Sequence, residues 1–119
     1  MDLYGKTLAI TGASSGIGAE IARLARFKGA QVIGLDRNDP MITLDGFIKI
    51  DMGDTAAIDA AVQALPAGID ALVNAAGVSG MLDREIVARV NYLGLRHLTE
   101  AALPKIVKGG AVVNITSIL

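Results

Sequence analysis

The sequence predicts an α/β fold built on a parallel, doubly wound sheet with helices on both faces. Of its 119 residues, 52% are apolar, 19% are charged and only 3% are aromatic. This composition favours a parallel sheet covered on both faces over an antiparallel sheet with one face in water. Short apolar runs also alternate with segments of helical periodicity along the chain. We therefore expect residues 1–119 to form one domain.

The alternation predicts five strands, at residues 6–11, 31–35, 47–50, 71–74 and 111–115. Helices are expected at 16–28, from Asp54 or Thr55 to Leu65, and at 82–107 with a bend near 91–94. Gly29, Pro66 and the pair Gly109-Gly110 are expected to end these three helices. Right-handed crossovers between the parallel strands then give the sheet order 3-2-1-4-5.

Several classes of protein are disfavoured by the composition. A formal net charge of −1 without a basic run argues against a nucleic-acid partner, and no stretch approaches the roughly 18 apolar residues that span a membrane. The chain has no cysteine and its only histidine is His97, which is expected on a helix surface, so no metal site is expected. The lack of cysteine and of a signal-peptide pattern favours a cytoplasmic location.

A glycine-rich turn lies between the first expected strand and the first helix. It reads Thr11-Gly12-Ala13-Ser14-Ser15-Gly16-Ile17-Gly18. Glycines here permit a tight turn and close approach of the backbone, so that N–H groups and a helix N-terminus face a pyrophosphate. The predicted cofactor-binding residues of this turn are Gly12, Ser14, Ser15, Gly16, Ile17 and Gly18. The alternative is a plain strand–helix turn.

An acidic residue, Asp36, ends the second expected strand. A carboxylate at this place accepts both hydroxyls of an adenosine ribose and repels a 2′-phosphate, which favours NAD over NADP. Arg37 is a competing signal, because a guanidinium can pair with a 2′-phosphate. The alternative interpretation of Arg37 is a solvated loop residue.

Polar or small residues also follow the next two strands. Asp51 and Met52 are predicted to meet the adenine edge, although Asp51 could instead cap a helix. Asn74 is predicted to tie neighbouring strands together, and Ala75 and Gly77 leave room for a dinucleotide above the backbone. A turn without a ligand is the alternative for this second segment.

Two further polar residues are candidate catalytic groups. Asn91 lies within an expected helix, where asparagine is unfavourable, which indicates bending, bound water or function. Ser117 follows the last apolar strand, where a hydroxyl would face the crevice and bond a substrate oxygen. The alternatives are an ordinary exposed residue for Asn91 and a polar strand end for Ser117.

Together these segments resemble the N-terminal half of the short-chain dehydrogenase/reductase family. The resemblance rests on residues 11–18, Asp36, Asp51, Asn74-Ala75-Ala76-Gly77, Asn91-Tyr92-Leu93-Gly94 and Asn114-Ile115-Thr116-Ser117. It implies a Rossmann-type fold and hydride transfer between NAD and an alcohol or ketone. It also implies that Asn91 supports a proton-relay water and that Ser117 orients the substrate. A homo-oligomer is implied for the full-length form.

The chain departs from the family pattern in two respects. The family's proton donor is a tyrosine four residues before a lysine, and neither Tyr4 nor Tyr92 has a lysine at that spacing. The sixth and seventh strands of the family are not encoded in these 119 residues either. We therefore expect an enzyme fragment without turnover. One alternative is a natural short module that binds a nucleotide or a partner without catalysis, and another is a different doubly wound nucleotide binder.

Overall fold

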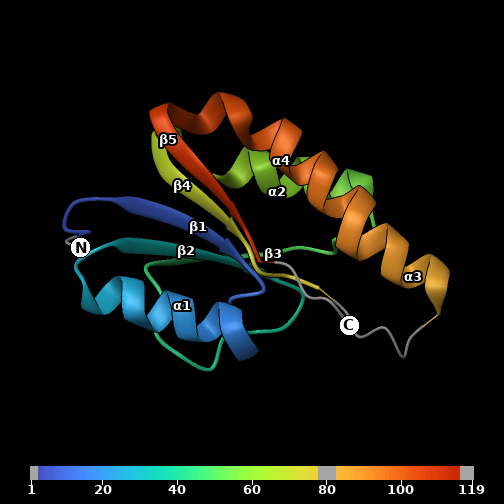
Figure 1. The fold of residues 1–119 in the computed structure, drawn as a ribbon, viewed down its shortest axis with the longest axis horizontal. Helices are drawn as coiled ribbons and strands as arrows, with labels where there is room; N and C mark the ends of the chain where they lie inside the picture. Colours follow the sequence, from blue (N-terminus) through green and yellow to red (C-terminus); the bar gives the residue numbers. More distant parts are fainter. Residues whose placement is uncertain (1–2, 78–82, 116–119) are drawn as a thin grey trace.

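The computed structural model describes residues 3–77 and 83–115, and its centre is a five-stranded parallel sheet. The strands are β1 (Thr7–Thr11), β2 (Gln31–Asp36), β3 (Gly46–Lys49), β4 (Ile69–Asn74) and β5 (Ile106–Asn114). Their order is β3-β2-β1-β4-β5, and every neighbouring pair is parallel. The predicted doubly wound sheet is therefore confirmed, and Figure 1 shows the strands pointing toward one edge.

Helices cover both faces of the sheet (Figure 1). One face carries α1 (Gly16–Phe27), and the other carries α2 (Thr55–Ala64) and α4 (Leu95–Ala102). The segment before α4 consists of α3 (Arg84–Ala88) and the π-helical turn η1 (Arg89–Gly94), and a short 3-10 turn, η2 (Leu103–Lys105), follows it. Asp54 caps α2, since its carboxylate accepts from the N–H groups of Ala56 and Ala57. No helix in the described residues is long and apolar enough to cross a membrane.

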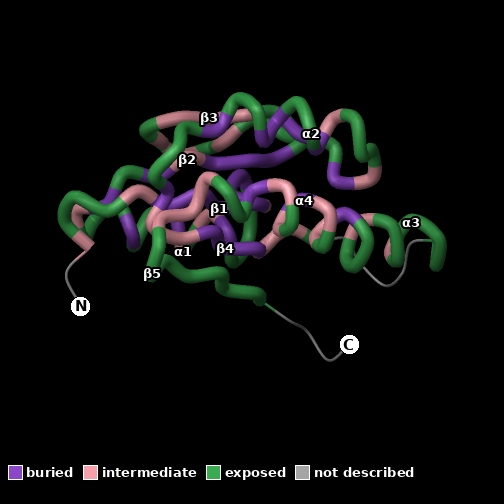
Figure 2. The backbone as a smooth tube through the Cα atoms, turned by 90° about the horizontal axis from the view of Figure 1, so that it is seen from above, coloured by how far each residue is buried: buried purple, intermediate pink, exposed green. Residues whose placement is uncertain are grey.

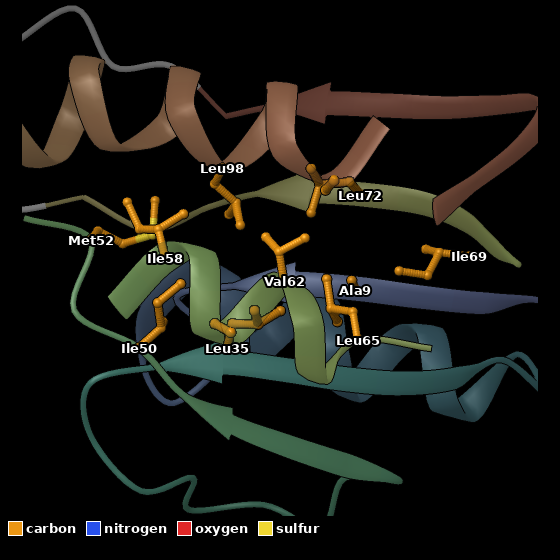
Figure 3. Packing of buried hydrophobic residues seen from close by; sticks show 12 residues of the cluster. Ala9, Leu35, Ile50, Met52, Ile58, Val62, Leu65, Ile69, Leu72 and Leu98 are labelled. Atoms are coloured by element: carbon orange, nitrogen blue, oxygen red, sulfur yellow. The ribbon is translucent and has the colours of Figure 1, made fainter. Parts of the chain in front are cut away.

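Two apolar clusters hold the layers together, one on each face of the sheet. Successive residues of β1 pack on opposite faces: Leu8 and Ile10 contact α1, whereas Ala9 faces α2 and α4. Figure 3 shows the larger cluster, in which Ile58 and Val62 of α2 meet Leu98 of α4 above the sheet. Burial of both faces explains why the central strands are apolar runs rather than alternating patterns.

The third helical stretch is shorter than predicted, and β5 begins earlier. Helical structure ends at Lys105, and β5 starts at Ile106, which pairs with Ile69 of β4. The glycine pair expected to stop the helix lies inside β5, where Gly109 has a φ of +84°. A register shift between Ile69 and Ala71 accompanies it, so these glycines accommodate an irregularity in the strand. Figure 2 shows the exposed, peripheral course of β5.

The expected bend near residues 91–94 coincides with the π-helical turn η1. Gly94 is buried there, and a Cβ on this residue would collide with the main-chain oxygen of Met52. The glycine therefore allows the helical segment to approach the loop after β3. Single π-helical turns are often found at functional sites, and this one borders the carboxyl edge of the sheet.

We expect Asp45→Asn to destabilise the fold in a pH-dependent way. The Asp45 carboxylate accepts from the Val32 N–H at 2.8 Å and from Arg26 Nε at 3.1 Å. The hydrogen bond from Val32 is the main cause that lowers the pKa of Asp45, and the bond from Arg26 adds to it. A lowered pKa stabilises the folded state above the unfolded-state pKa, and this contribution is lost as the pH falls through the folded-state pKa.

The expected loss near pH 7 is about 0.5–1 kcal/mol, because the side chain is partly exposed and its charge is screened. Urea unfolding of the wild type and of Asp45→Asn between about pH 7 and pH 3 measures the difference in unfolding free energy. It should shrink as the pH falls below about 4. A difference that is constant over this range would contradict the assignment.

Candidate functional site

A cleft of about 510 Å³ opens at the carboxyl edge of the sheet. Most of the predicted cofactor-binding residues line it: Gly12, Ser15, Gly16, Ile17, Asp36, Arg37, Asp51, Met52, Ala75 and Gly77. The cleft is also lined by Ala76, which was quoted only as part of the motif after the fourth strand, and by four residues without a predicted role, Leu35, Asn38, Ile50 and Val90. The cleft therefore joins four strand ends with the π-helical turn, at the edge where ligands bind in doubly wound sheets.

The glycine-rich turn forms one wall of the cleft by packing backbone against backbone. Gly12 has a φ of +69°, and a Cβ on it would lie 2.8 Å from the N and Cα atoms of Ala76. A Cβ on Gly18, in the first turn of α1, would collide with the main-chain oxygen of Gly12. The α1 N-cap, Ser15, makes no side-chain cap bond, and the first N–H groups of a helix have no partner within it. This end of α1 is therefore suited to an anionic group.

Asp36 is nearly buried at the end of β2, where both carboxylate oxygens accept hydrogen bonds from the backbone. Oδ2 accepts from the Ser14 N–H and Oδ1 from the Asn38 N–H, each at 3.0 Å. Ser14 was predicted to bind the cofactor, but its hydroxyl donates to the Asn38 main-chain oxygen at 2.6 Å. A carboxylate offers about four lone-pair sites, so Asp36 keeps acceptor capacity for a ligand. The exposed Arg37 also borders the cleft.

Thr11 is a positioning residue that sequence reasoning quoted only as part of the turn. Its side chain is buried, and Oγ1 accepts from the N–H groups of Ala75 and Ala76, both at 3.0 Å. These bonds fix the segment after β4 against the end of β1. The available signal was a hydroxyl at the last position of an otherwise apolar strand.

Asn74 forms the predicted tie between neighbouring elements. Its Nδ2 donates to Asn114 Oδ1 of β5 at 2.9 Å and to Thr99 Oγ1 of α4 at 3.1 Å. Asn74 Oδ1 is buried and has no hydrogen-bond partner among the described residues. Asn74, Ser14 and Gly18 are buried and do not line the cleft, so they support its walls from behind.

The far end of the cleft combines apolar and acidic groups. Ile50 and Met52 are nearly buried and border it together with Val90 of η1. Asp51 Oδ1 accepts from the Gly53 N–H at 2.9 Å, while Asp54 serves as the cap of α2. A flat, apolar ring with polar edges suits such a wall.

Of the two predicted catalytic residues, the described part of the structure includes Asn91 but not Ser117. Asn91 lies on η1, and its Oδ1 is 3.3 Å from the position of a Cβ on Gly77, which places its side chain beside the end of β4. Ser117 lies outside the described residues. His97, which was given no role, lies with Nε2 2.7 Å from Asp59 Oδ1 at the surface between α4 and α2.

The doubly wound sheet, its order and the cleft at its carboxyl edge define a Rossmann-like α/β protein. Comparison with known families gives a match to the short chain dehydrogenase model over residues 6–119. The chain belongs to the short-chain dehydrogenase family, whose members use NAD(P).

Individual relatives agree with this family. The chain is 53% identical to a coniferyl-alcohol dehydrogenase of Pseudomonas sp. strain HR199, over 100% of this chain and 47% of that protein. It superposes on the aldohexose dehydrogenase of Thermoplasma acidophilum with a TM-score of 0.87 and 27% identity, over 97% of this chain and 50% of that one. A Burkholderia cenocepacia short chain dehydrogenase in complex with NADP gives a TM-score of 0.83 and 27% identity, over 99% of this chain and 58% of that one. The chain thus spans about half the length of these proteins.

Proposed function

We propose that the chain supplies the cofactor-binding part of an NAD-dependent oxidoreductase that acts on the CH–OH group of an alcohol or on the corresponding ketone. The observation that carries the NAD assignment is the Asp36 carboxylate, which borders the cleft at the end of β2 with both oxygens held by backbone N–H groups. A fixed negative charge there accepts ribose hydroxyls and opposes a 2′-phosphate. The Burkholderia protein was solved with NADP, which is a property of that protein. In this chain, Arg37 is the cleft residue that would favour binding of NADP.

The residues of the cleft fit a dinucleotide along its length. The turn between β1 and α1 would hold the pyrophosphate, Asp36 the ribose, and the wall of Ile50, Met52 and Val90 the adenine. Bound cofactor supplies hydride acceptance and donation at its nicotinamide ring. The chain's own residues bind and orient it, since the close backbone contacts of Gly12 and Gly18 keep the turn in place.

The proposed roles of the catalytic residues are those that family membership suggests. Asn91 would hold a water of the proton relay, and Ser117 would orient the substrate oxygen. The 119 residues contain two tyrosines, Tyr4 and Tyr92, and neither precedes a lysine by four residues. We therefore expect nucleotide binding but no turnover from these 119 residues alone.

Coniferyl alcohol is the first substrate to test, because a coniferyl-alcohol dehydrogenase is 53% identical over the whole of this chain. Calorimetry of the protein with NAD and NADP should give a lower Kd for NAD. NADH formation from coniferyl alcohol should be detectable at the protein's natural length and undetectable for residues 1–119. Preference for NADP would overturn the cofactor assignment, and turnover by residues 1–119 would overturn the expected need for further residues.

A further inference from the structure

We infer that Ser14 is a positioning residue that sets the nucleotide preference of the cleft by holding Asp36 and the loop after β2. The inference rests on the proposed function and goes beyond it, because Ser14 does not itself line the cleft. Its hydroxyl donates to the Asn38 main-chain oxygen at 2.6 Å. Ser14 is only 6% exposed, so little of its side chain is accessible to a ligand.

Three hydrogen bonds close a small ring between two loops. Asp36 accepts from the N–H groups of Ser14 and Asn38, and the Ser14 hydroxyl completes the ring at the Asn38 oxygen. One loop is the glycine-rich turn after β1, and the other follows β2. Figure 1 shows both at the edge toward which the strands point. The ring therefore links the glycine-rich turn, which would hold the pyrophosphate, to Asp36 at the predicted ribose site.

The ring also fixes the direction of the carboxylate. Each oxygen receives one backbone N–H from a different segment, which holds the carboxylate plane and leaves one acceptor direction on each oxygen. Two vicinal ribose hydroxyls need two such directions. The Ser14 hydroxyl adds nothing to the carboxylate directly but keeps Asn38, and with it one of the two N–H donors, in place.

Loss of the Ser14 hydroxyl should therefore act through Asp36. In Ser14→Ala, the Asn38 segment loses its link to the glycine-rich turn, while the main-chain bond from residue 14 to Asp36 remains possible. We expect the Kd for NAD to rise about three- to tenfold, the range of one neutral hydrogen bond. The Kd for NADP should change less, because a 2′-phosphate does not use the carboxylate, and the preference for NAD should fall.

The test is a double-mutant cycle read by calorimetric binding of NAD and NADP to the protein at its natural length. Ser14→Ala is measured in the wild-type and in the Asp36→Ala background, with thermal unfolding recorded for each protein. The expected result is a weaker NAD complex in the first background and no further change in the second. Asp45→Asn removes contacts at the far end of the same loop, where Asp45 bonds Val32 near the start of β2. It should lower stability and leave the ratio of the two Kd values unchanged.

The other outcomes separate failure of this inference from failure of the proposed function. An equal loss of NAD affinity in both backgrounds would mean that Ser14 contacts the ligand, which overturns the inference. No change in either background would overturn the inference as well. So would a fall in the preference for NAD in Asp45→Asn that equals the fall in Ser14→Ala. A wild-type protein that prefers NADP or binds neither nucleotide would instead overturn the proposed function.

Discussion

Gly18→Ala is expected to destabilise the fold by more than about 2 kcal/mol and to abolish measurable nucleotide binding. The added Cβ would collide with the main-chain oxygen and carbon of Gly12. Neither group is the end of a flexible side chain, so the conflict is relieved only if α1 or the turn moves. Movement of α1 would separate its N-terminus from Gly12, and Gly12 in turn packs against Ala76. The glycine-rich turn, which would hold the pyrophosphate, would lose its shape, and the fold would lose stability.

Gly46→Ala in β3 is the matched control for this substitution. A Cβ at Gly46 would lie 3.5 Å or more from its nearest neighbours, atoms of the Ile33 side chain, which is ordinary contact. Its unfolding free energy should stay within about 0.5 kcal/mol of the wild type. Urea unfolding followed by circular dichroism, with calorimetry for NAD, compares the two variants. If Gly18→Ala resembled Gly46→Ala in both measurements, the close packing of the turn would not be needed for the site.

Much of the fold could be predicted because one physical pattern determines it. Strands buried on both faces are short apolar runs, helices show a repeat near 3.6 residues, and the parallel order leaves few topologies. The same reasoning located the candidate site, since the residues after β1, β2, β3 and β4 must meet at one edge. Asp36, Asp51 and Gly77 line one cleft for that reason.

What the sequence did not reveal depends on contacts between distant segments. The Thr11 bonds to residues 75 and 76, and the Thr99 bond to Asn74, pair distant segments, and the sequence does not indicate which partners meet. The glycine pair at 109–110 was misread because a left-handed glycine can end a helix or accommodate an irregular strand, and only pairing with β4 decides. The Ser14 hydroxyl likewise has a partner that only the folded chain brings near it.

Asp36→Asn is expected to reverse or abolish the preference for NAD. The Ser14 and Asn38 N–H groups face different oxygens of Asp36, so an asparagine in the same position presents an NH₂ group to one of them, and that donor loses its partner. The ribose also loses a charged acceptor. Hydrogen bonds to charged groups contribute about 1.5–3 kcal/mol, so the Kd for NAD should rise about 10- to 100-fold. The Kd for NADP should stay the same or fall, because the charge that repels a 2′-phosphate is gone.

Asp39→Asn is the control, since it removes the same charge three residues further along the chain, at a residue that does not line the cleft. Asp39 is 84% exposed at its side chain and lies 3.7 Å from Lys49 Nζ, an exposed pair of small expected energy. Its ratio of Kd values for NAD and NADP should equal that of the wild type. If Asp36→Asn and Asp39→Asn shifted the ratio equally, the effect would be one of net charge. If Asp36→Asn left the ratio unchanged, Asp36 would not be the ribose acceptor, and the assignment of NAD would lose its main support.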